Sequence, residues 1–217
     1  LLLFGGMNVF DSLIFSFGTA GTGGFANYSA SVGYFDSVYI DTVITVFMIL
    51  FGINFNLYYF LLLKDWRPVW KNEELKTYLI LILSSAMLIT INMNHLYPNP
   101  FKAFRYAIFQ VASIITTTGY ATADFTGWPM FSQCMLMFLM LVGACASSTG
   151  GGMKVSRVMM MVKCVKREIM QMAHPKSVSI IRMNGKKVDQ DVLKTLYIYL
   201  IAYLGILIGS VLLVSVD

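Results

Sequence analysis

The sequence predicts an all-α integral membrane protein built from repeated units, each with a helix, a loop that dips into the membrane and a second helix. Hydrophobic residues make up 57% of the 217 residues and charged residues 12%, whereas about 25% of the residues of a soluble domain are charged. Two Gly- and Thr-rich stretches each follow an apolar run that is too short to cross a bilayer. When Gly24 is aligned with Gly119, an offset of 95 residues, Thr22 falls on Thr117.

The first short apolar run covers residues 10–21, well below the roughly 20 residues that a spanning helix needs. We expect it to enter the membrane and stop, with Asp11 and Ser12 capping its N-terminus and Gly18 and Gly21 loosening its end. Residues 37–63 are long enough to span with some tilt, and one spanning helix is expected there.

The second unit repeats this order after a polar connector at residues 66–76, where Pro68 disfavours one continuous helix. Residues 78–93 are predicted to span the membrane. Pro98 and Pro100 mark the following loop, and residues 101–115 form the second short apolar run.

The next apolar run, from Pro129 to Val142, ends in ten small or polar residues, 143–152, that are poor helix formers. A helix that breaks at membrane depth needs protein or water around the break. Close packing of membrane helices is the alternative reason for such small residues. The helical pattern resumes at Met153, and a last apolar run covers residues 193–216.

The basic residues orient the chain in the membrane. Of the sixteen Lys and Arg residues, four lie in residues 64–76 and ten in residues 154–194, so both regions are expected in the cytoplasm. The net charge of +5 is therefore explained without nucleic acid. Lys102 and Arg105 fall outside, and both short helices enter from the outer face.

This arrangement suits the passage of a cation. A short helix that enters from outside points its partly negative C-terminal end toward the membrane centre. Carbonyl and Thr oxygens beyond it can replace the hydration shell of an ion, and Gly lets the backbone come close. Neither stretch contains a carboxylate, which favours a monovalent ion over Ca²⁺. An ordinary Gly/Thr turn between membrane helices is the alternative.

Four acidic residues, Asp11, Asp36, Asp41 and Asp124, fall on the predicted outer face. They either raise the local concentration of cations or serve as caps and turn residues. The three cysteines lack paired spacing and lie in apolar segments, so we interpret them as packing residues rather than a disulfide or metal site.

Three runs together resemble the TrkH/KtrB family of bacterial potassium uptake proteins. They are FGTAGTGGF at residues 17–25, TTTGY at 116–120 and GACASSTGGGMK at 143–154. The resemblance covers essentially the whole chain. Such proteins have four helix–pore loop–helix repeats, similar to those of potassium channels, around one pore. The chain begins without Met and ends directly after an apolar run, so we expect a fragment that is cut at both ends.

The resemblance implies a division into five parts. Residues 1–65 supply the second repeat with its pore helix, filter loop and inner helix, and residues 66–76 a cytoplasmic connector. Residues 77–172 supply the third repeat, with a pore loop at 101–125 and an inner helix broken at 143–152. Residues 173–192 form a cytoplasmic linker, and residues 193–217 the first helix of the fourth repeat.

The resemblance also implies which residues bind K⁺ and which gate the pore. The first filter segment consists of Thr22, Gly23, Gly24 and Phe25, and the second filter segment of Thr117, Thr118, Gly119 and Tyr120. Phe is more usual than Tyr at the last position. The gating loop consists of Gly143, Ala144, Cys145, Ala146, Ser147, Ser148, Thr149, Gly150, Gly151 and Gly152. The first and fourth filter segments of a complete ring lie outside this chain.

The implied function is potassium uptake across the bacterial inner membrane through a channel-like pore. K⁺ is the transported ion, bound at the filter residues, and no catalytic residue, cofactor or other metal is expected. Family members look like homodimers in the lipid bilayer. Many associate with a cytoplasmic nucleotide-binding regulatory ring of the TrkA/KtrA kind, for which the basic surface of residues 154–187 offers a docking area.

Two other classes compete with this interpretation. A membrane-embedded enzyme would need a catalytic constellation in the apolar segments, but His95 and His174 lie in polar stretches and Ser147 lacks an evident base. A secondary cation transporter coupled to Na⁺ or H⁺, with lower K⁺ selectivity, is the alternative that stays open. Such a transporter usually places ionisable groups at the midplane, where the predicted spans have none.

Overall fold

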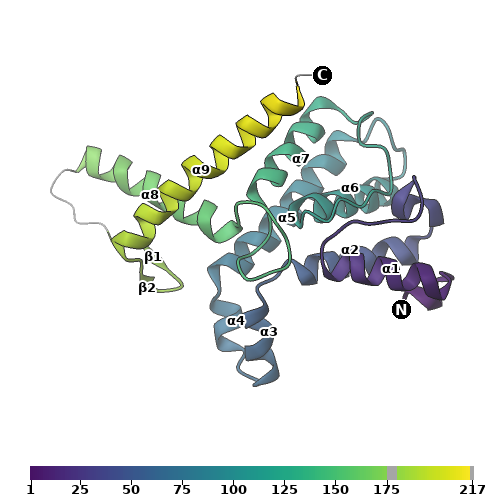
Figure 1. Ribbon diagram of the computed structural model, residues 1–217, viewed down its shortest axis with the longest axis horizontal. Coiled ribbons are helices and arrows are strands. Elements are labelled where there is room, and N and C mark those ends of the chain that lie inside the picture. Colours follow the sequence, from purple (N-terminus) through teal and green to yellow (C-terminus); the bar gives the residue numbers. More distant parts are fainter. Residues whose placement is uncertain (175–179, 216–217) are drawn as a thin grey trace. The chain divides into compact units, whose positions relative to one another are not determined.

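Helices make up most of the protein in a computed structural model, which describes residues 1–174 and 180–215 (Figure 1). The chain divides into unit 1, Leu1–Val155, and unit 2, Ser156–Asp217. The α-helices are α1 (Val9–Ala20), α2 (Val38–Phe51), α3 (Phe55–Leu62), α4 (Arg67–Lys71), α5 (Glu73–Asn92), α6 (Pro100–Ile115), α7 (Met130–Val142), α8 (Val155–Ala173) and α9 (Gln190–Val214). Shorter elements are the 3₁₀-helices η1 (Leu2–Gly5) and η2 (Ser31–Phe35) and the strands β1 (Arg182–Met183) and β2 (Lys186–Lys187).

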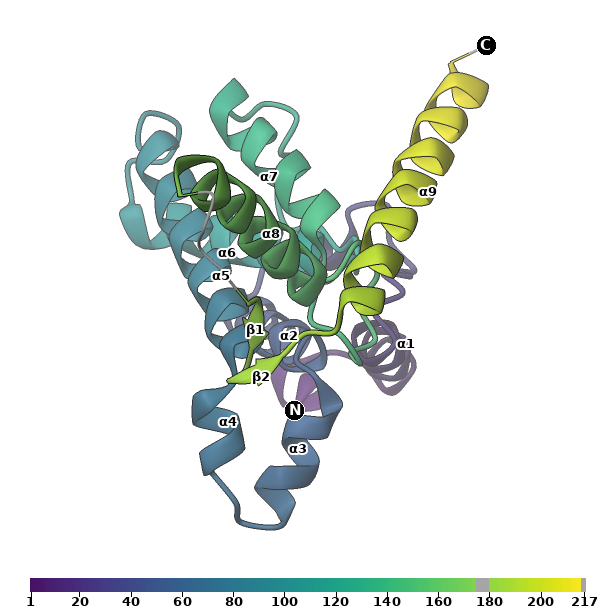
Figure 2. The same cartoon turned by 90° about the vertical axis from the view of Figure 1, so that its left-hand side faces the viewer.

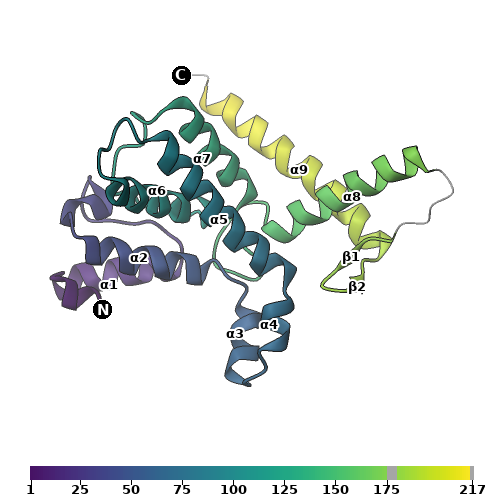
Figure 3. The same cartoon turned by 180° about the vertical axis from the view of Figure 1, so that it is seen from behind.

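Helix α6 is the core of unit 1, where α2, α5 and α7 pack against it (Figures 1 and 3). Its N-terminus is capped by Asn99, whose side-chain oxygen accepts a hydrogen bond from the Phe101 N–H at 3.0 Å. Pro100 suits the first turn because it has no N–H to satisfy. Every residue from Phe109 to Ser113 is buried. A helix buried on all sides needs neighbours on every face, and α6 has them.

Helix α1, the counterpart of α6, packs against α2 (Figure 3). Its cap is Asn8, whose side-chain oxygen accepts a hydrogen bond from the Asp11 N–H at 2.7 Å. The prediction that Asp11 and Ser12 cap this helix is therefore wrong. The buried side chains that join α1, α2 and α6 are Phe15, Ile40, Ile44, Met48, Phe109 and Ala112.

The single spanning helix predicted over residues 37–63 is broken in two. Helix α2 ends at Phe51, α3 begins at Phe55, and the two helices are bent by 92°. The break lies at Gly52, where a Cβ atom would lie 2.2 Å from the Tyr78 hydroxyl. A larger residue would collide with the Tyr78 side chain of α5, so the packing at this position favours glycine.

The backbone groups released at this break find partners in the gating loop. The Gly52 carbonyl accepts a hydrogen bond from the Cys145 N–H at 3.0 Å, and the Phe55 N–H donates to the Ser147 carbonyl at 3.0 Å. An apolar run of this length normally predicts a continuous helix. The break cannot be predicted from the local sequence, because the groups that pair with its backbone lie about 90 residues further along the chain.

The polar connector predicted over residues 66–76 is mostly helical. Helix α4 carries Pro68 in its first turn. Helices α3 and α4 form a hairpin, visible at the bottom of Figure 2. Helix α5 begins at Glu73, capped by Asn72, whose side-chain oxygen accepts from the Leu75 N–H at 2.8 Å. The helix thus starts before the span predicted from residue 78.

Unit 2 contains most of α8, a short hairpin and α9. Strands β1 and β2 pair antiparallel around Asn184 and Gly185, whose φ angles of +49° and +78° suit a two-residue hairpin turn. Cys164, Ile181 and Leu193 form a small core, which fits the packing role predicted for the cysteine. Residues 175–179 of the predicted linker and residues 216–217 of the last predicted helix lie outside the described residues.

Length and composition identify the possible membrane crossings. Among the described residues, α5 and α9 are each long and apolar enough to cross, and the bent pair α2–α3 offers a third crossing. Helices α1 and α7 are apolar but have only 12 and 13 residues. The short length of α1 agrees with a helix that enters the membrane without crossing it.

We expect Gly52→Ala to lower the melting temperature of the full-length protein in detergent. The new methyl group would meet the Tyr78 hydroxyl at 2.2 Å and the Thr116 methyl at 2.9 Å, and overfilling a packed site costs about 1–3 kcal/mol. Adding Tyr78→Phe should recover part of the loss. Gly127→Ala is the control, because nothing lies within 4 Å of a Cβ there; an equal loss in this control would contradict the explanation.

Candidate functional site

The two filter segments follow helices that end in the same way. Three backbone hydrogen bonds close each helix end, and they recur at the offset of 95 residues. In the first copy the N–H groups of Gly21, Thr22 and Gly23 donate, in this order, to the carbonyls of Phe17, Thr19 and Gly18. In the second copy the N–H groups of Thr116, Thr117 and Thr118 donate, in the same order, to the carbonyls of Ala112, Ile114 and Ser113. The repeat that the sequence indicates is therefore present in the backbone.

Two residues of each segment adopt the left-handed backbone conformation, again at equivalent positions. The φ angle is +48° at Thr22 and +57° at Thr117, and it is +68° at Gly24 and +86° at Gly119. Left-handed residues other than Gly, Asn and Asp are uncommon. The two threonines are thus held in this conformation by their surroundings.

Three carbonyl oxygens in each segment have no hydrogen-bond donor. Within the described part of the chain, the carbonyls without a donor in these segments are those of Thr22, Gly23, Gly24, Thr117, Thr118 and Gly119. Thr22 and Thr118 are buried, Gly24 and Thr117 are half-buried, and Gly23 and Gly119 are exposed. Because buried backbone carbonyls are nearly always paired, the two equivalent rows are candidates for accepting a ligand.

The carbonyls immediately before these rows are paired by the filter threonines themselves. The Thr22 hydroxyl donates to the Gly21 carbonyl at 2.8 Å, and the Thr117 hydroxyl donates to the Thr116 carbonyl at 2.6 Å. The carbonyls after the rows are paired too, because that of Phe25 accepts from the Tyr120 hydroxyl at 3.2 Å. Each row of free oxygens is thus bounded at both ends.

The two filter segments touch each other. Gly24 lies so close to the second segment that a Cβ atom would be 1.8 Å from the Thr118 carbonyl oxygen. The Tyr120 ring is fully buried and lies beside Phe15, with ring centroids 5.4 Å apart. Phe25 itself is 76% exposed, so the two equivalent aromatic residues differ in burial.

The gating loop leaves α7 and reaches α8 through one narrow neck. Gly143 and Gly152 both have positive φ angles, +74° and +77°, and a Cβ on Gly143 would lie 2.8 Å from the Gly152 Cα. The Val155 N–H donates to the Ala144 carbonyl at 3.0 Å. Only glycine permits this approach, so the neck explains two of the loop's glycines.

The gating loop lies against the first residue of both filter segments. The Thr22 hydroxyl lies 3.0 Å from the Thr149 carbonyl and shares its one hydrogen between this oxygen and that of Gly21, while the Gly151 N–H donates to the Thr117 hydroxyl at 2.6 Å. Gly150 is close as well, since a Cβ there would lie 2.9 Å from the Thr116 carbonyl oxygen. The structure thus brings all three predicted groups of residues together in unit 1.

A buried acid also holds the gating loop. The Ala146 N–H donates to a Glu74 carboxylate oxygen at 2.7 Å, and Glu74 is only 5% exposed. At the end of the loop the Lys154 ammonium donates to the Gly150 carbonyl. The sequence does not reveal the part played by Glu74, because an acid in a polar connector is normally solvated.

The acids predicted on the outer face make structural contacts. Buried Asp11 accepts hydrogen bonds at 2.8 Å from both the Asn27 amide and the Tyr28 hydroxyl. The hydrogen bond to Asp11 is the main reason that the pKa of Tyr28 is raised. Asp11 therefore fastens the chain beyond the first filter segment to the start of α1.

The other three acids are similarly engaged. Asp41 is buried 3.5 Å from Arg105, and Asp36 lies 3.9 Å from the same guanidinium. Asp124 accepts hydrogen bonds from the Thr126 N–H and hydroxyl at 2.9 and 2.7 Å, and they lower its pKa. Asp124 therefore serves as a turn residue, whereas Asp36 and Asp41 pair with Arg105 and do not cap a helix with their side chains.

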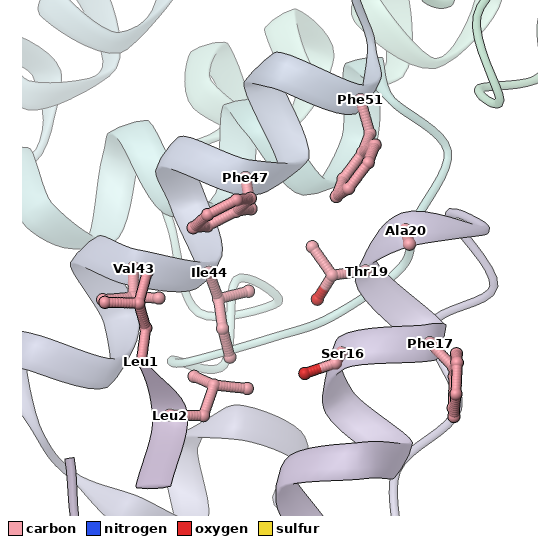
Figure 4. A pocket seen from close by; sticks show the side chains of 10 residues that line it. All are labelled: Leu1, Leu2, Ser16, Phe17, Thr19, Ala20, Val43, Ile44, Phe47 and Phe51. Atoms are coloured by element: carbon pink, nitrogen blue, oxygen red, sulfur yellow. The ribbon is translucent and has the colours of Figure 1, made fainter. Parts of the chain in front are cut away.

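A cavity of about 350 Å³ lies between α1, α2 and η1. Figure 4 shows Phe47 and Phe51 of α2 across from Thr19 of α1. None of its lining residues belongs to a filter segment or to the gating loop, so it is not part of the candidate ion path. Among residues 1–174 and 180–215, no group of three or more His, Cys, Asp or Glu side chains could hold a metal ion.

Known proteins match the chain over nearly its whole length. The family model described as TrkH, cation transport protein, matches residues 4–216. The Trk system potassium uptake protein TrkH of Vibrio parahaemolyticus is 34% identical over 203 residues, which are 91% of this chain and 42% of that protein. TrkH of Escherichia coli K12 is 32% identical over 97% of this chain and 44% of its own length.

A solved structure matches the fold. The crystal structure of the potassium transporter TrkH from Vibrio parahaemolyticus superposes with a TM-score of 0.91 at 32% identity, covering 96% of this chain and 46% of that one. The chain thus spans less than half the length of the relatives it matches. The predicted all-α, repeated membrane fold and its fragment character are confirmed by this match.

We expect Gly24→Ala to destabilise the full-length protein far more than Gly119→Ala, although the two glycines are equivalent in the repeat. Both substitutions strain a positive φ angle, which costs of order 1–3 kcal/mol. A Cβ at Gly24 would also lie 1.8 Å from the Thr118 carbonyl oxygen, whereas nothing lies within 4 Å at Gly119. Melting temperatures of the two variants measure the difference; equal losses would mean that the segments do not touch as described.

Proposed function

We propose that this chain, which belongs to the TrkH family of cation transport proteins, supplies two of the four filter segments and the gate of a potassium uptake pore. The observation that carries the proposal is the pair of equivalent carbonyl rows in residues 22–24 and 117–119, which no donor reaches in the described chain. Such oxygens replace the water around an ion as it enters a filter.

The ligands in these rows favour a weakly hydrated monovalent ion. All six are neutral backbone oxygens, and the segments contain no carboxylate. Helices α1 and α6 end directly before them, so the partial negative charge at each C-terminus adds attraction for a cation. The names of the TrkH relatives as potassium uptake proteins fit K⁺ as the transported ion.

The filter residues carry distinct tasks in this proposal. Thr22 and Thr117 begin the rows and hold the preceding carbonyls with their hydroxyls, while Gly23, Gly24, Thr118 and Gly119 present oxygens to the ion. Phe25 and Tyr120 close the rows, joined by the hydrogen bond between the Tyr120 hydroxyl and the Phe25 carbonyl. The missing two segments of the ring would come from the rest of the protein.

Residues 143–152 act as the gate in this proposal. Their contacts with Thr22 and Thr117, the first residues of the two rows, support this role, because a loop held there lies at one end of the rows of carbonyls. Opening requires these contacts to break. In this proposal the narrow neck at Gly143 and Gly152 is the hinge about which the loop moves.

The membrane location and the partner proteins are proposed by analogy with the TrkH family. In this proposal the full-length protein crosses the bacterial inner membrane several times and forms a homodimer. It works with a cytoplasmic nucleotide-binding ring of the TrkA/KtrA kind. Support for the ring comes from the basic residues of unit 2, among them Lys163, Lys166 and Arg182. The family consists of cation transport proteins and is not a class of enzymes.

A secondary transporter coupled to Na⁺ or H⁺ is not favoured. Coupling usually needs an ionisable group near the membrane midplane. The buried acids of the described helices α2 and α5 are Asp41 and Glu74, and both lie in the first turn of their helix. Each is engaged by Arg105 or by the gating loop.

We expect Gly119→Ser to lower the preference for K⁺ over Na⁺ in the full-length protein. The serine would strain the positive φ angle at Gly119 and so shift the carbonyls of its row, while the open space around a Cβ there avoids a steric clash with the rest of the fold. Uptake of K⁺, Rb⁺ and Na⁺ into proteoliposomes measures the preference. Gly127→Ser is the control outside the segments. An unchanged preference in a folded Gly119→Ser protein would rule out the filter assignment.

Deleting residues 147–149 should raise K⁺ flux in the same proteoliposomes. The deletion removes Thr149, the partner of Thr22, and shortens the loop that obstructs the path. The control replaces the same three residues by glycine, which keeps the length of the loop and its backbone carbonyls. If the deletion protein folds and its flux equals that of the control, the loop is not the gate.

A further inference from the structure

The two filter segments differ in how their outer ends are held. The carbonyls of Phe25 and Tyr120 are equivalent in the repeat, and both are hydrogen-bonded. That of Tyr120 accepts from the hydroxyl of Ser113 in its own copy at 2.6 Å. That of Phe25 accepts from the hydroxyl of Tyr120 at 3.2 Å, which belongs to the other copy.

The alignment of the two copies explains why the Phe25 carbonyl takes its hydrogen-bond donor from the other copy. The counterpart of Ser113 is Gly18, which has no side chain to donate. A Cβ atom on Gly18 would lie 2.2 Å from the Tyr120 hydroxyl and 3.4 Å from the Phe25 carbonyl oxygen. The Tyr120 hydroxyl therefore occupies the space in which a serine at this position would stand, and it makes the bond that such a serine would make.

We propose that Tyr120 is a positioning residue for the first filter segment, whose hydroxyl replaces the serine hydroxyl that Gly18 lacks. The inference rests on the proposed function. Its hydrogen bond keeps the Phe25 carbonyl out of the row of ligands and ties the outer ends of both segments together. Gly18 and Tyr120 thus act as a matched pair, in which the small residue makes room for the hydroxyl.

Packing of the aromatic ring is the simpler account of Tyr120. The ring is fully buried and lies beside Phe15, so phenylalanine would fill nearly the same volume. The two accounts differ in what the hydroxyl contributes. Packing predicts that Tyr120→Phe is silent, whereas the matched pair predicts a loss that a serine at position 18 repairs.

The experiment compares full-length variants by the ratio of K⁺ to Na⁺ uptake into proteoliposomes. Tyr120→Phe should lower the ratio roughly two- to tenfold, the factor that corresponds to one neutral hydrogen bond. Adding Gly18→Ser should restore the ratio, because the serine oxygen then reaches the Phe25 carbonyl. Adding Gly18→Ala instead is the matched control, which supplies the same Cβ without a hydroxyl and should not restore it.

Melting temperatures of the same variants provide a second readout that does not depend on ion flux. They should fall in Tyr120→Phe and recover with Gly18→Ser but not with Gly18→Ala. A silent Tyr120→Phe, or equal recovery with serine and alanine, would overturn the inference. If the unaltered protein fails to discriminate K⁺ from Na⁺, the proposed function fails. The melting temperatures then still show whether a serine hydroxyl at position 18 replaces the Tyr120 hydroxyl as the donor to the Phe25 carbonyl.

Discussion

Backbone groups that leave a helix inside a bilayer must find partners within the protein, because lipid offers none. This constraint gathers the irregular parts of unit 1 in one place. The break after α2 is satisfied by the gating loop through Cys145 and Ser147, and the gating loop is bonded in turn to Thr22 and Thr117. Each irregular segment is stable because the others are present.

The carbonyl rows at residues 22–24 and 117–119 are the exception to this pairing, and the exception gives the site its chemistry. Thr22 and Thr118 are buried, and a buried oxygen without a donor costs free energy unless a ligand pairs with it. The bonded carbonyls on either side mark the limits of each row. In the proposed pore, an ion that sheds its water is the partner of these oxygens.

The sequence predicts the features that depend on local pattern and repetition. The short α1 and α6, the equivalence of Thr22 with Thr117, and the irregular residues 143–152 all follow from run length, offset and small-residue content. The break at Gly52 could not be foreseen, because it depends on Tyr78 of α5 and on a loop distant in the chain. Glu74 was missed for the same reason, since its burial arises from tertiary contact.

The neck at Gly143 and Gly152 has an energetic consequence for regulation. Because the ends of the loop are held together at Gly143 and Gly152 and by the hydrogen bond from Val155 to Ala144, its ten residues form a unit that, in the proposed gate, opens locally while unit 1 stays folded. The resistance to opening is then a handful of hydrogen bonds, each contributing about 1 kcal/mol. A regulatory partner of the proposed gate would then need a coupling free energy of only about 1–3 kcal/mol, without a large rearrangement of the membrane helices.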